Sequence, residues 1–181
     1  MPSQSLVVDF LPVTIFNRRK LKSFDCGNEA MNEYLHRNLA RKNHESGLSP
    51  CLIVVPRGAD EPILGYVTVS NATVAKGDPP EPLLEQFPSY PIPVTLIGRL
   101  AVSKDHQGKG VGRRILMHVY FTHARAVREL HIGSVGVITD AIDQNAVRFY
   151  EKNDFQLFPG SEGFPKRMFI ANATIFDAVD Q

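Results

Sequence analysis

The sequence predicts an α/β fold, with a mixed central sheet of about seven strands flanked by helices. Two stretches carry this prediction. In residues 94–130 an apolar run is followed by a glycine-rich turn and an amphipathic helical pattern, and in residues 135–153 a second apolar run precedes a second helical pattern. Short apolar runs that alternate with helical patterns are typical of parallel strands joined by helices.

The first half of the chain is expected to contain three strands and one helix. The helix covers residues 28–45, with Asp25 as its candidate N-cap and Gly47 as its stop. A turn at residues 56–62 separates the second strand from the third. The strands cover residues 13–17, 51–55 and 63–75.

The second half is expected to complete the sheet. The proline-rich residues 77–93 form a loop with one short helix near residues 83–87. The order after this loop is strand, glycine-rich turn, helix, strand, helix and two closing strands. The helices cover residues 110–130 and 143–153, and the strands cover residues 94–102, 135–139, 155–158 and 167–176.

The composition predicts one soluble domain that spans residues 1–181. A chain of 181 residues with 43% apolar residues is long enough to bury a substantial core. We expect neither a membrane span nor a secretory signal, because the chain has no run of 18 apolar residues and no charged N-terminal segment before a long apolar one. Cys26 and Cys51 have no metal-ligand spacing, so we predict no metal site and expect both thiols to be reduced and buried.

The segment Gln-Gly-Lys-Gly-Val-Gly at residues 107–112 predicts a pyrophosphate-binding loop. Its three glycines let the backbone approach a ligand closely and aim several N–H groups at one anion. The helix that begins there adds its unpaired first-turn N–H groups and the positive end of its dipole. Full positive charges flank this backbone at Lys109, Arg113 and Arg114.

Two common phosphate-binding loops are excluded by the spacing of this segment. A P-loop requires a glycine five residues before the Gly-Lys pair and Ser or Thr after the lysine, but Ser103 and Gly110 occupy these positions. A dinucleotide-binding fingerprint requires a third glycine where Arg113 stands, and it opens the first βαβ unit of its domain.

Two motifs instead resemble the GNAT family of acyltransferases. Gln107, Gly110 and Gly112 match its coenzyme A signature, Gln-x-x-Gly-x-Gly, and residues 143–155 are similar to its C-terminal motif. In that second motif Asp143 stands where Asn is usual, and Asp154 stands where Gly is usual. Asp tolerates positive φ better than most residues.

The resemblance implies the GNAT fold, acetyl-CoA as co-substrate and a cytoplasmic N-acetyltransferase. It implies that the pantetheine arm bonds along the exposed edge of the strand at residues 94–102 and reaches the first residue of the C-terminal motif. The residues implied to bind coenzyme A are Leu100, Ala101, Val102, Gln107, Gly108, Lys109, Gly110, Val111, Gly112, Arg113 and Asp143.

The same resemblance assigns Tyr150 as the general acid that protonates the leaving thiolate. The alternative is that Tyr150 is only a core aromatic on the inner face of its helix. A general base is absent from the expected strand at residues 94–102, where the only ionisable residue is Arg99. Neutralising a lysine at pH 7 costs about 4–5 kcal/mol, whereas an α-amine costs about 1 kcal/mol, so such a site suits an amine of low pKa. Asp140 is a second candidate base, and the alternative is that it is a solvated loop carboxylate.

The N-terminal half resembles the GNAT toxins of toxin–antitoxin modules. The similarity lies in the segments at residues 24–35, 64–70 and 98–102. It implies acetylation of the α-amine of aminoacyl-tRNA and a ribbon-helix-helix antitoxin as partner, and a homodimer is also expected. The residues expected to contact this substrate are Arg99, Arg37, Arg41 and Lys42.

The distribution of charge is compatible with an RNA substrate. The net charge is only +1, but residues 17–44 hold seven Lys or Arg against three acids, and residues 99–128 hold seven against one. By spacing, Arg37, Arg41 and His44 share one face of the expected helix. The alternative is that some of these residues only neutralise the phosphates of coenzyme A and that the rest are ordinary solvent-exposed surface residues. Two other functions therefore stay open: an acetyltransferase for a small amine or a protein N-terminus, and an inactive module that binds coenzyme A.

Overall fold

The computed structural model describes residues 7–74, 91–159 and 162–181. Its strands form one sheet of seven, in the order β1-β2-β3-β4-β5-β7-β6. The β4–β5 pair is parallel and the β1–β2, β2–β3, β5–β7 and β6–β7 pairs are antiparallel, which confirms the predicted mixed sheet. The strands are β1 (Val8–Pro12), β2 (Cys51–Pro56), β3 (Gly65–Val74), β4 (Ile92–Val102), β5 (Gly136–Ala141), β6 (Gln156–Leu157) and β7 (Lys166–Ala171).

The chain forms two compact units. Unit 1 comprises Met1–Val69 and Arg99–Ile115, and unit 2 comprises Ser70–Gly98 and Leu116–Gln181. None of the helices in the described parts of the chain is long and apolar enough to cross a membrane.

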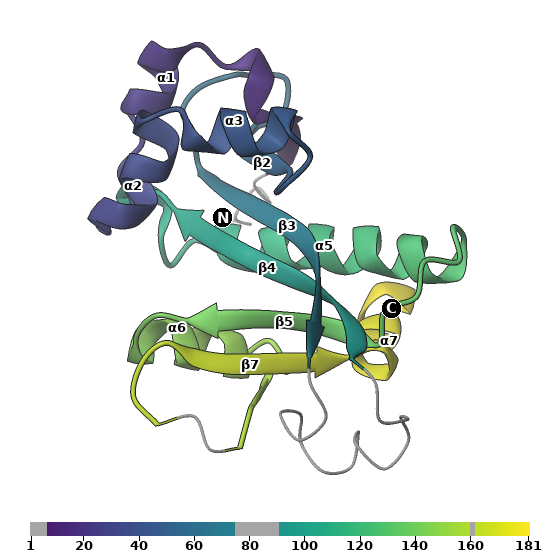
Figure 1. Cartoon of the computed structure of the whole chain (residues 1–181). Helices are drawn as coiled ribbons and strands as arrows, with labels where there is room; N and C mark the ends of the chain where they lie inside the picture. The colour runs from purple at the N-terminus through teal and green to yellow at the C-terminus, as the bar shows by residue number, and fades with distance from the viewer. Residues whose placement is uncertain (1–6, 75–90, 160–161) are drawn as a thin grey trace, which may run out of the picture. The chain divides into compact units, whose positions relative to one another are not determined.

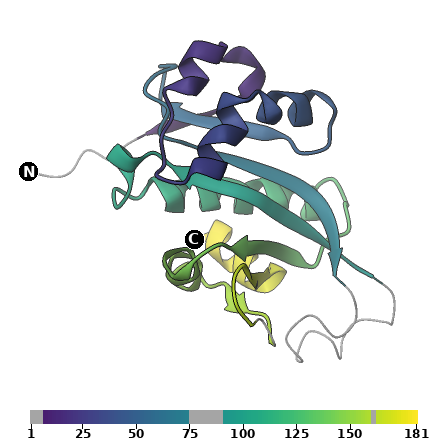
Figure 2. The ribbon, with the colours of Figure 1, turned by 60° about the vertical axis from the view of Figure 1, so that its left-hand side comes forward.

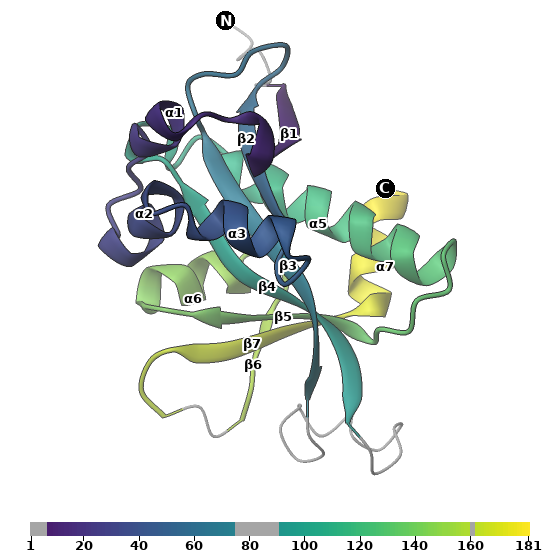
Figure 3. The same ribbon diagram turned by 45° about the horizontal axis from the view of Figure 1, so that its top comes forward.

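In unit 1 three short helices lie together beside β2 (Figures 1 and 3). They are α1 (Arg18–Lys22), α2 (Glu29–His36) and α3 (Leu39–Glu45), and Figure 2 shows the same three from another side. Their apolar side chains pack with those of β2 and β3 in one buried cluster. Fully or almost fully buried members of this cluster include Leu21, Tyr34, Leu35, Ile53 and Tyr66.

The predicted first strand is displaced in the structure. Residues 8–12 form β1, and Val13–Ile15 form a 3-10 helix instead of the strand expected at 13–17. The reason lies in the spacing of the buried residues. Val13 and Phe16 are 0% and 1% exposed, and a separation of three residues brings side chains to one side of a 3-10 turn but to opposite faces of a strand.

The single helix predicted for residues 28–45 is also wrong, because the chain breaks at Asn38. This residue has φ 65°, a left-handed conformation that Asn adopts more readily than most residues, and it separates α2 from α3. The N-cap of α2 is Asn28, whose side chain accepts a hydrogen bond from the N–H of Met31, and not the predicted Asp25. Gly47 does end the region as predicted, with φ 72° one residue beyond Ser46, the C-cap of α3.

Unit 2 contains most of α5 (Val111–Arg128) together with β5, β6, β7 and two further helices. The helices α6 (Gln144–Glu151) and α7 (Asn172–Asp180) lie near opposite ends of the β5–β7 pair (Figures 1 and 3). One apolar cluster in this unit includes Val74, Val94, Ile138, Phe158 and Phe169.

The closing strand predicted for residues 167–176 ends early. β7 stops at Ala171, and the next residues form α7. Asn172 begins this helix, and both polar atoms of its side-chain amide have a partner. Nδ2 donates to the carbonyl of Ser134 at 2.7 Å, and Oδ1 lies 2.7 Å from Nε2 of the buried His123. Ile175 is then fully buried, so the apolar pattern in this stretch belongs to a helix face.

The remaining predicted elements agree closely with the structure. β2, β3, β5, α5 and α6 lie within two residues of their expected ends, and β4 begins two residues earlier than expected. The expected loop at 77–93 and its short helix at 83–87 lie almost entirely outside the described residues. Both cysteines are free: Cys51 is fully buried and Cys26 is half-buried. Burial raises the pKa of Cys51 to about 12.

We predict that Gly65→Ala destabilises the protein. Gly65 lies in β3, where an added Cβ would approach the carbonyl oxygen of Ala101 to 2.5 Å, so the backbone would have to shift. We expect a loss of about 1–3 kcal/mol in the free energy of unfolding, measured by urea denaturation. Gly133→Ala is the matched control, because an added Cβ there meets nothing within 4 Å. Equal stability of the two variants would contradict the close approach.

Candidate functional site

The glycine-rich loop of unit 1 connects β4 to α5. After Val102 the chain makes a short 3-10 helix (Lys104–His106) and then runs through residues 107–110 into α5. Gly108 and Gly110 have φ values of 71° and 80°, which few residues other than glycine adopt readily. A Cβ added at either glycine would meet nothing within 4 Å, so the backbone faces open space.

Positive charge without a partner surrounds this loop. The side chains of Lys109 and Arg113 are exposed, and Arg114 is half-buried. Within the described parts of the chain, no side-chain hydrogen bond or ion pair satisfies these three, and Nε of Arg114 is buried without a partner. The first-turn N–H groups of α5 also have no acceptor within the helix. Loop and helix together therefore have the properties of an anion-binding site.

The side chain of Gln107 braces the loop from within. Its Nε2 donates to the carbonyl of Val102 at 3.0 Å and to the carbonyl of Cys26 at 2.9 Å. It therefore links the end of β4 to the segment that precedes α2. The role that the structure gives to this amide nitrogen is to hold the loop in shape.

Asp25 adds a second link to the same loop, which the sequence did not reveal. Its carboxylate pairs with Nζ of Lys104 at 2.8 Å, and its carbonyl accepts from the N–H of Lys104 at 2.9 Å. The hydrogen bond from Lys104, with those from Gly27 and Asn32, lowers the pKa of Asp25 to about 2. No pattern could have predicted this pair, because its members lie 79 residues apart.

The end of β4 carries Arg99 and the predicted pantetheine-binding residues. The parallel ladder with β5 joins Thr95–Ile97 to Val137–Thr139 and ends there, although β4 continues to Val102. Ala101 is buried, and Leu100 and Val102 are half-buried. The guanidinium of Arg99 lies over the ring of Tyr34, 3.9 Å from its centroid.

The basic residues expected on one helix face are divided, because the break at Asn38 separates Arg37 from Arg41 and His44 on α3. Arg37, directly after α2, forms an ion pair with Glu33. Arg41 donates to the carbonyl of Phe16 and lies 3.7 Å from Glu45. These contacts, and those of His44 with the backbone of Cys51, serve the local fold. The side chain of Lys42 on α3 is exposed.

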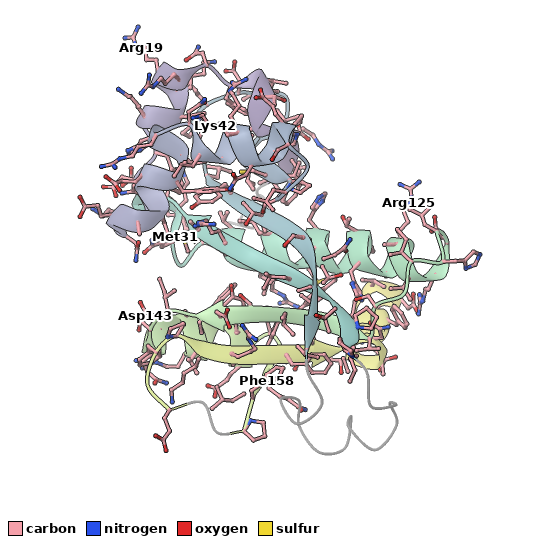
Figure 4. All side chains as sticks on the ribbon, in the orientation of Figure 1. Arg19, Met31, Lys42, Arg125, Asp143 and Phe158 are labelled. Carbon is pink, nitrogen blue, oxygen red and sulfur yellow. The ribbon has the colours of Figure 1, made fainter. Side chains whose placement is uncertain are left out.

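In unit 2, α6 carries Asp143 and Tyr150. Asp143 is the N-cap of this helix, and its carboxylate accepts from the N–H of Ala146 at 2.8 Å (Figure 4 labels Asp143). Asp154, beyond the end of the helix, has φ 66°, which confirms that Asp adopts positive φ where the family usually has Gly.

Tyr150 is buried but retains a polar contact. Its side chain is 5% exposed and contacts the rings of Phe149 and Phe155, with each ring centroid 5.1 Å from its own. Its hydroxyl lies 3.3 Å from Oγ1 of Thr139, a β5 residue that sequence reasoning missed. Burial raises the pKa of Tyr150 to about 12, and the hydrogen bond from Thr139 acts in the opposite direction.

Asp140 lies on a strand and not in a loop, although its side chain remains 38% exposed. It lies in β5, and its two oxygens accept from Nε and a terminal nitrogen of Arg167 at 2.9 and 3.2 Å. This two-point pairing with a neighbouring strand gives Asp140 a structural role.

Comparison with known proteins identifies the family. The model described as acetyltransferase (GNAT) domain matches residues 54–157, which include the glycine-rich loop and Tyr150. The "tRNA-acetylating toxin" of Mycobacterium tuberculosis (strain ATCC 25618 / H37Rv) is 30% identical over 148 residues, which cover 82% of this chain and 85% of that protein.

Solved structures agree in fold. A mutant of KacT, with a tyrosine replaced by phenylalanine, matches with a TM-score of 0.83 at 23% identity, and covers 97% of this chain and 99% of that one. AtaT complexed with acetyl-methionyl-tRNAfMet matches with a TM-score of 0.81 at 24% identity, over 95% of this chain and 99% of that one. The chain therefore belongs to the GNAT acetyltransferase family.

Proposed function

We propose that this protein transfers an acetyl group from acetyl-CoA to the α-amine of aminoacyl-tRNA, as the toxin of a toxin–antitoxin module. The structural observation that carries the proposal is the loop at residues 107–112, where open glycine backbone meets unpaired positive charge. The acceptor is suggested by the 30% identical relative, a tRNA-acetylating toxin. Because charged tRNA is a cytoplasmic substrate, we place the protein in the cytoplasm.

The residues of the loop fit the pyrophosphate of coenzyme A. Gly108, Gly110 and the first turn of α5 (Val111, Gly112 and Arg113) offer N–H groups, and Lys109 and Arg113 offer charge. We assign the backbone of Leu100–Val102 to the pantetheine arm, and Asp143 to the same arm through the oxygen that does not cap α6. Gln107 contributes by shaping the loop. Acetyl-CoA supplies a thioester, whose carbonyl carbon forms a bond to the amine nitrogen as the bond to sulfur breaks.

Tyr150 is proposed as the general acid for the departing sulfur. A transfer from a phenol of pKa about 12 to a thiolate of reference pKa about 8.5 is uphill by about 5 kcal/mol, so the proton moves only as the negative charge on sulfur develops. The high pKa also keeps the phenol protonated at every pH at which the enzyme works. The hydrogen bond between Thr139 and the phenol oxygen favours the phenolate that forms, and the same Thr139 hydroxyl lies 3.2 Å from the carbonyl oxygen of Ile97.

The acceptor must lose a proton without help from a carboxylate on β4, which has none between Ile92 and Val102. Asp140, the other candidate base, is engaged by Arg167. An α-amine beside an ester has a low pKa and can give its proton to water, which supports aminoacyl-tRNA over lysine.

Two protein partners belong to this proposal. One is an antitoxin, which the sequence resemblance assigns to the ribbon-helix-helix class. AtaT, a structural relative at 24% identity, has been solved bound to the C-terminus of its antitoxin AtaR and acetyl-CoA. The other is a second copy of this chain in a homodimer.

We predict that Gly110→Glu abolishes coenzyme A binding, because the added carboxylate would lie against the backbone that receives the pyrophosphate. Isothermal calorimetry with coenzyme A measures this loss. Gly58→Glu is the matched control: Gly58 also has positive φ, 73°, and open space around it, but lies in the β2–β3 connection. The control should be destabilised similarly and should still bind. Unchanged affinity in folded Gly110→Glu would remove the loop from the site.

We predict that Tyr150→Phe lowers kcat by about 10²-fold and leaves coenzyme A affinity unchanged. Tyr120→Phe is the control, because Tyr120 is also a buried tyrosine of unit 2, whose hydroxyl donates to the carbonyl of Asn153 at 3.0 Å. That variant should lose stability but not rate. Steady-state assays with thiol release as the readout separate the two, and near-normal turnover of Tyr150→Phe would leave Tyr150 as a core aromatic only.

We predict that replacing Arg19, Arg37 and Lys42 together by Ala weakens acetylation of charged tRNA and flattens its salt dependence. The log–log slope should fall by about 0.7–0.9 for each phosphate that the variant no longer neutralises. Arg19 extends away from α1 (Figure 4), and Arg41 is kept because its bond to the Phe16 carbonyl supports the fold. Arg125→Ala, an exposed residue paired with Glu129, is the control. If the acetylation rate depended neither on salt concentration nor on the triple replacement, a small-amine substrate would be favoured.

A further inference from the structure

Arg99 is a cation held in one place without a counter-charge. It is half-buried on β4, and its guanidinium carbon lies 3.9 Å from the centroid of the Tyr34 ring. A ring face at this distance attracts a guanidinium and limits its motion. Within the described parts of the chain no hydrogen bond or ion pair to Arg99 is found, whereas Arg37, Arg128 and Arg167 are each paired with a carboxylate.

The ionisable groups around Arg99 do not neutralise it. Tyr34 on α2, Cys51 on β2 and Tyr66 on β3 all lie within its electrostatic reach. Burial raises the pKa of each of the three, so all are uncharged at neutral pH. Cys26 also packs against this cluster, and burial raises the pKa of its thiol, while His44 on α3 contacts the backbone of Cys51.

The field of Arg99 already acts on its surroundings. Its charge favours the negative forms of Tyr34, Cys51 and Tyr66, although burial outweighs it at all three. The same field opposes any positive charge that approaches. Arg99 directly precedes Leu100–Val102, the strand residues that we assign to the pantetheine arm, and an acceptor amine must come close to the thioester at the end of that arm.

We propose that Arg99 is an electrostatic positioning residue that keeps the acceptor amine in its neutral, nucleophilic form. This inference rests on the proposed function, because it assumes that the acceptor is an amine that reacts beside β4. It also explains how a site without a carboxylate on β4 can work. The enzyme does not remove the proton with a base; a fixed like charge makes the protonated amine unfavourable, and water takes the proton.

The pH dependence of kcat, measured at saturating acceptor, tests this role, because kcat reports ionisations in the enzyme–substrate complex, where the amine lies beside Arg99. The acceptor is total tRNA charged with a mixture of amino acids, and the readout is transfer of labelled acetyl between pH 6 and 8.5. A single neighbouring charge commonly changes a pKa by about one unit or more. We therefore expect Arg99→Gln to move the midpoint upward by about one unit, with about a tenfold loss of rate on the acidic side that closes on the alkaline side.

Two matched variants separate charge from structure. Arg99→Lys keeps the charge and should retain most of the wild-type midpoint. Tyr34→Phe keeps the ring face under Arg99, loses only the hydroxyl that accepts from Asn43, and should leave the midpoint unchanged. Coenzyme A affinity, measured by calorimetry, should be the same in all three variants.

Several results would overturn the inference. An Arg99→Gln rate reduced by the same factor at every pH would make Arg99 a structural or binding residue. A flatter salt dependence with an unmoved midpoint would make it a phosphate contact. Either result in an enzyme that acetylates charged tRNA defeats this inference alone, whereas wild-type protein inactive on charged tRNA defeats the proposed function.

Discussion

The contacts in unit 1 depend on the backbone between β4 and α5, which needs support from neighbouring segments. A helix leaves its first N–H groups without acceptors, and the loop before α5 adds two glycines at positive φ whose surroundings are open. Local interactions within such a segment are not enough to fix a single conformation. It is held by its neighbours, through the Gln107 amide on two carbonyls and the Asp25–Lys104 pair. Open backbone on one side and fixed supports on the other make this loop suited to a ligand that brings negative charge.

The positively charged residues fall into two groups, according to whether a nearby carbonyl or carboxylate pairs with them. In the first, arginines such as Arg41 and Arg167 donate to carbonyls or carboxylates nearby and tie elements together. In the second, Lys109, Arg113 and Arg99 have no such partner among the described residues. The charges of Lys109 and Arg113 stand beside the open backbone of Gly108 and Gly110, so they can add to its attraction for an anion. Net charge, which is +1, gives no sign of this division.

Local sequence predicted the features that local chemistry determines. Gly47 was predicted as a stop, Gly110 as part of a close-approach loop and Asp154 as a residue that tolerates positive φ, and the strand–loop–helix order follows from the apolar pattern. It could not predict features decided by tertiary contact. Asn38 fits a helix pattern but adopts a left-handed conformation. The apolar pattern after Ala171 is compatible with a strand as well as a helix, and the hydrogen bonds of Asn172 with Ser134 and His123 accompany the start of the helix. Within the site, the glycines were predictable, whereas Thr139 and Asp25 act through partners distant in sequence.

The hydrogen bonds of Gln107 make the loop sensitive to a chemical change that hardly alters the shape of the side chain. Its nitrogen donates to two carbonyl oxygens that belong to separate segments, those of Cys26 and Val102. Deamidation would turn this nitrogen into an oxygen, so that a carboxylate with no proton to give would face two acceptors in the same space. Glutamate has nearly the same shape as glutamine, but here its carboxylate would repel the carbonyl oxygens of Cys26 and Val102, to which the amide of Gln107 donates. The chemical ageing of one side chain would therefore open the loop without any change in the volume that the residue fills.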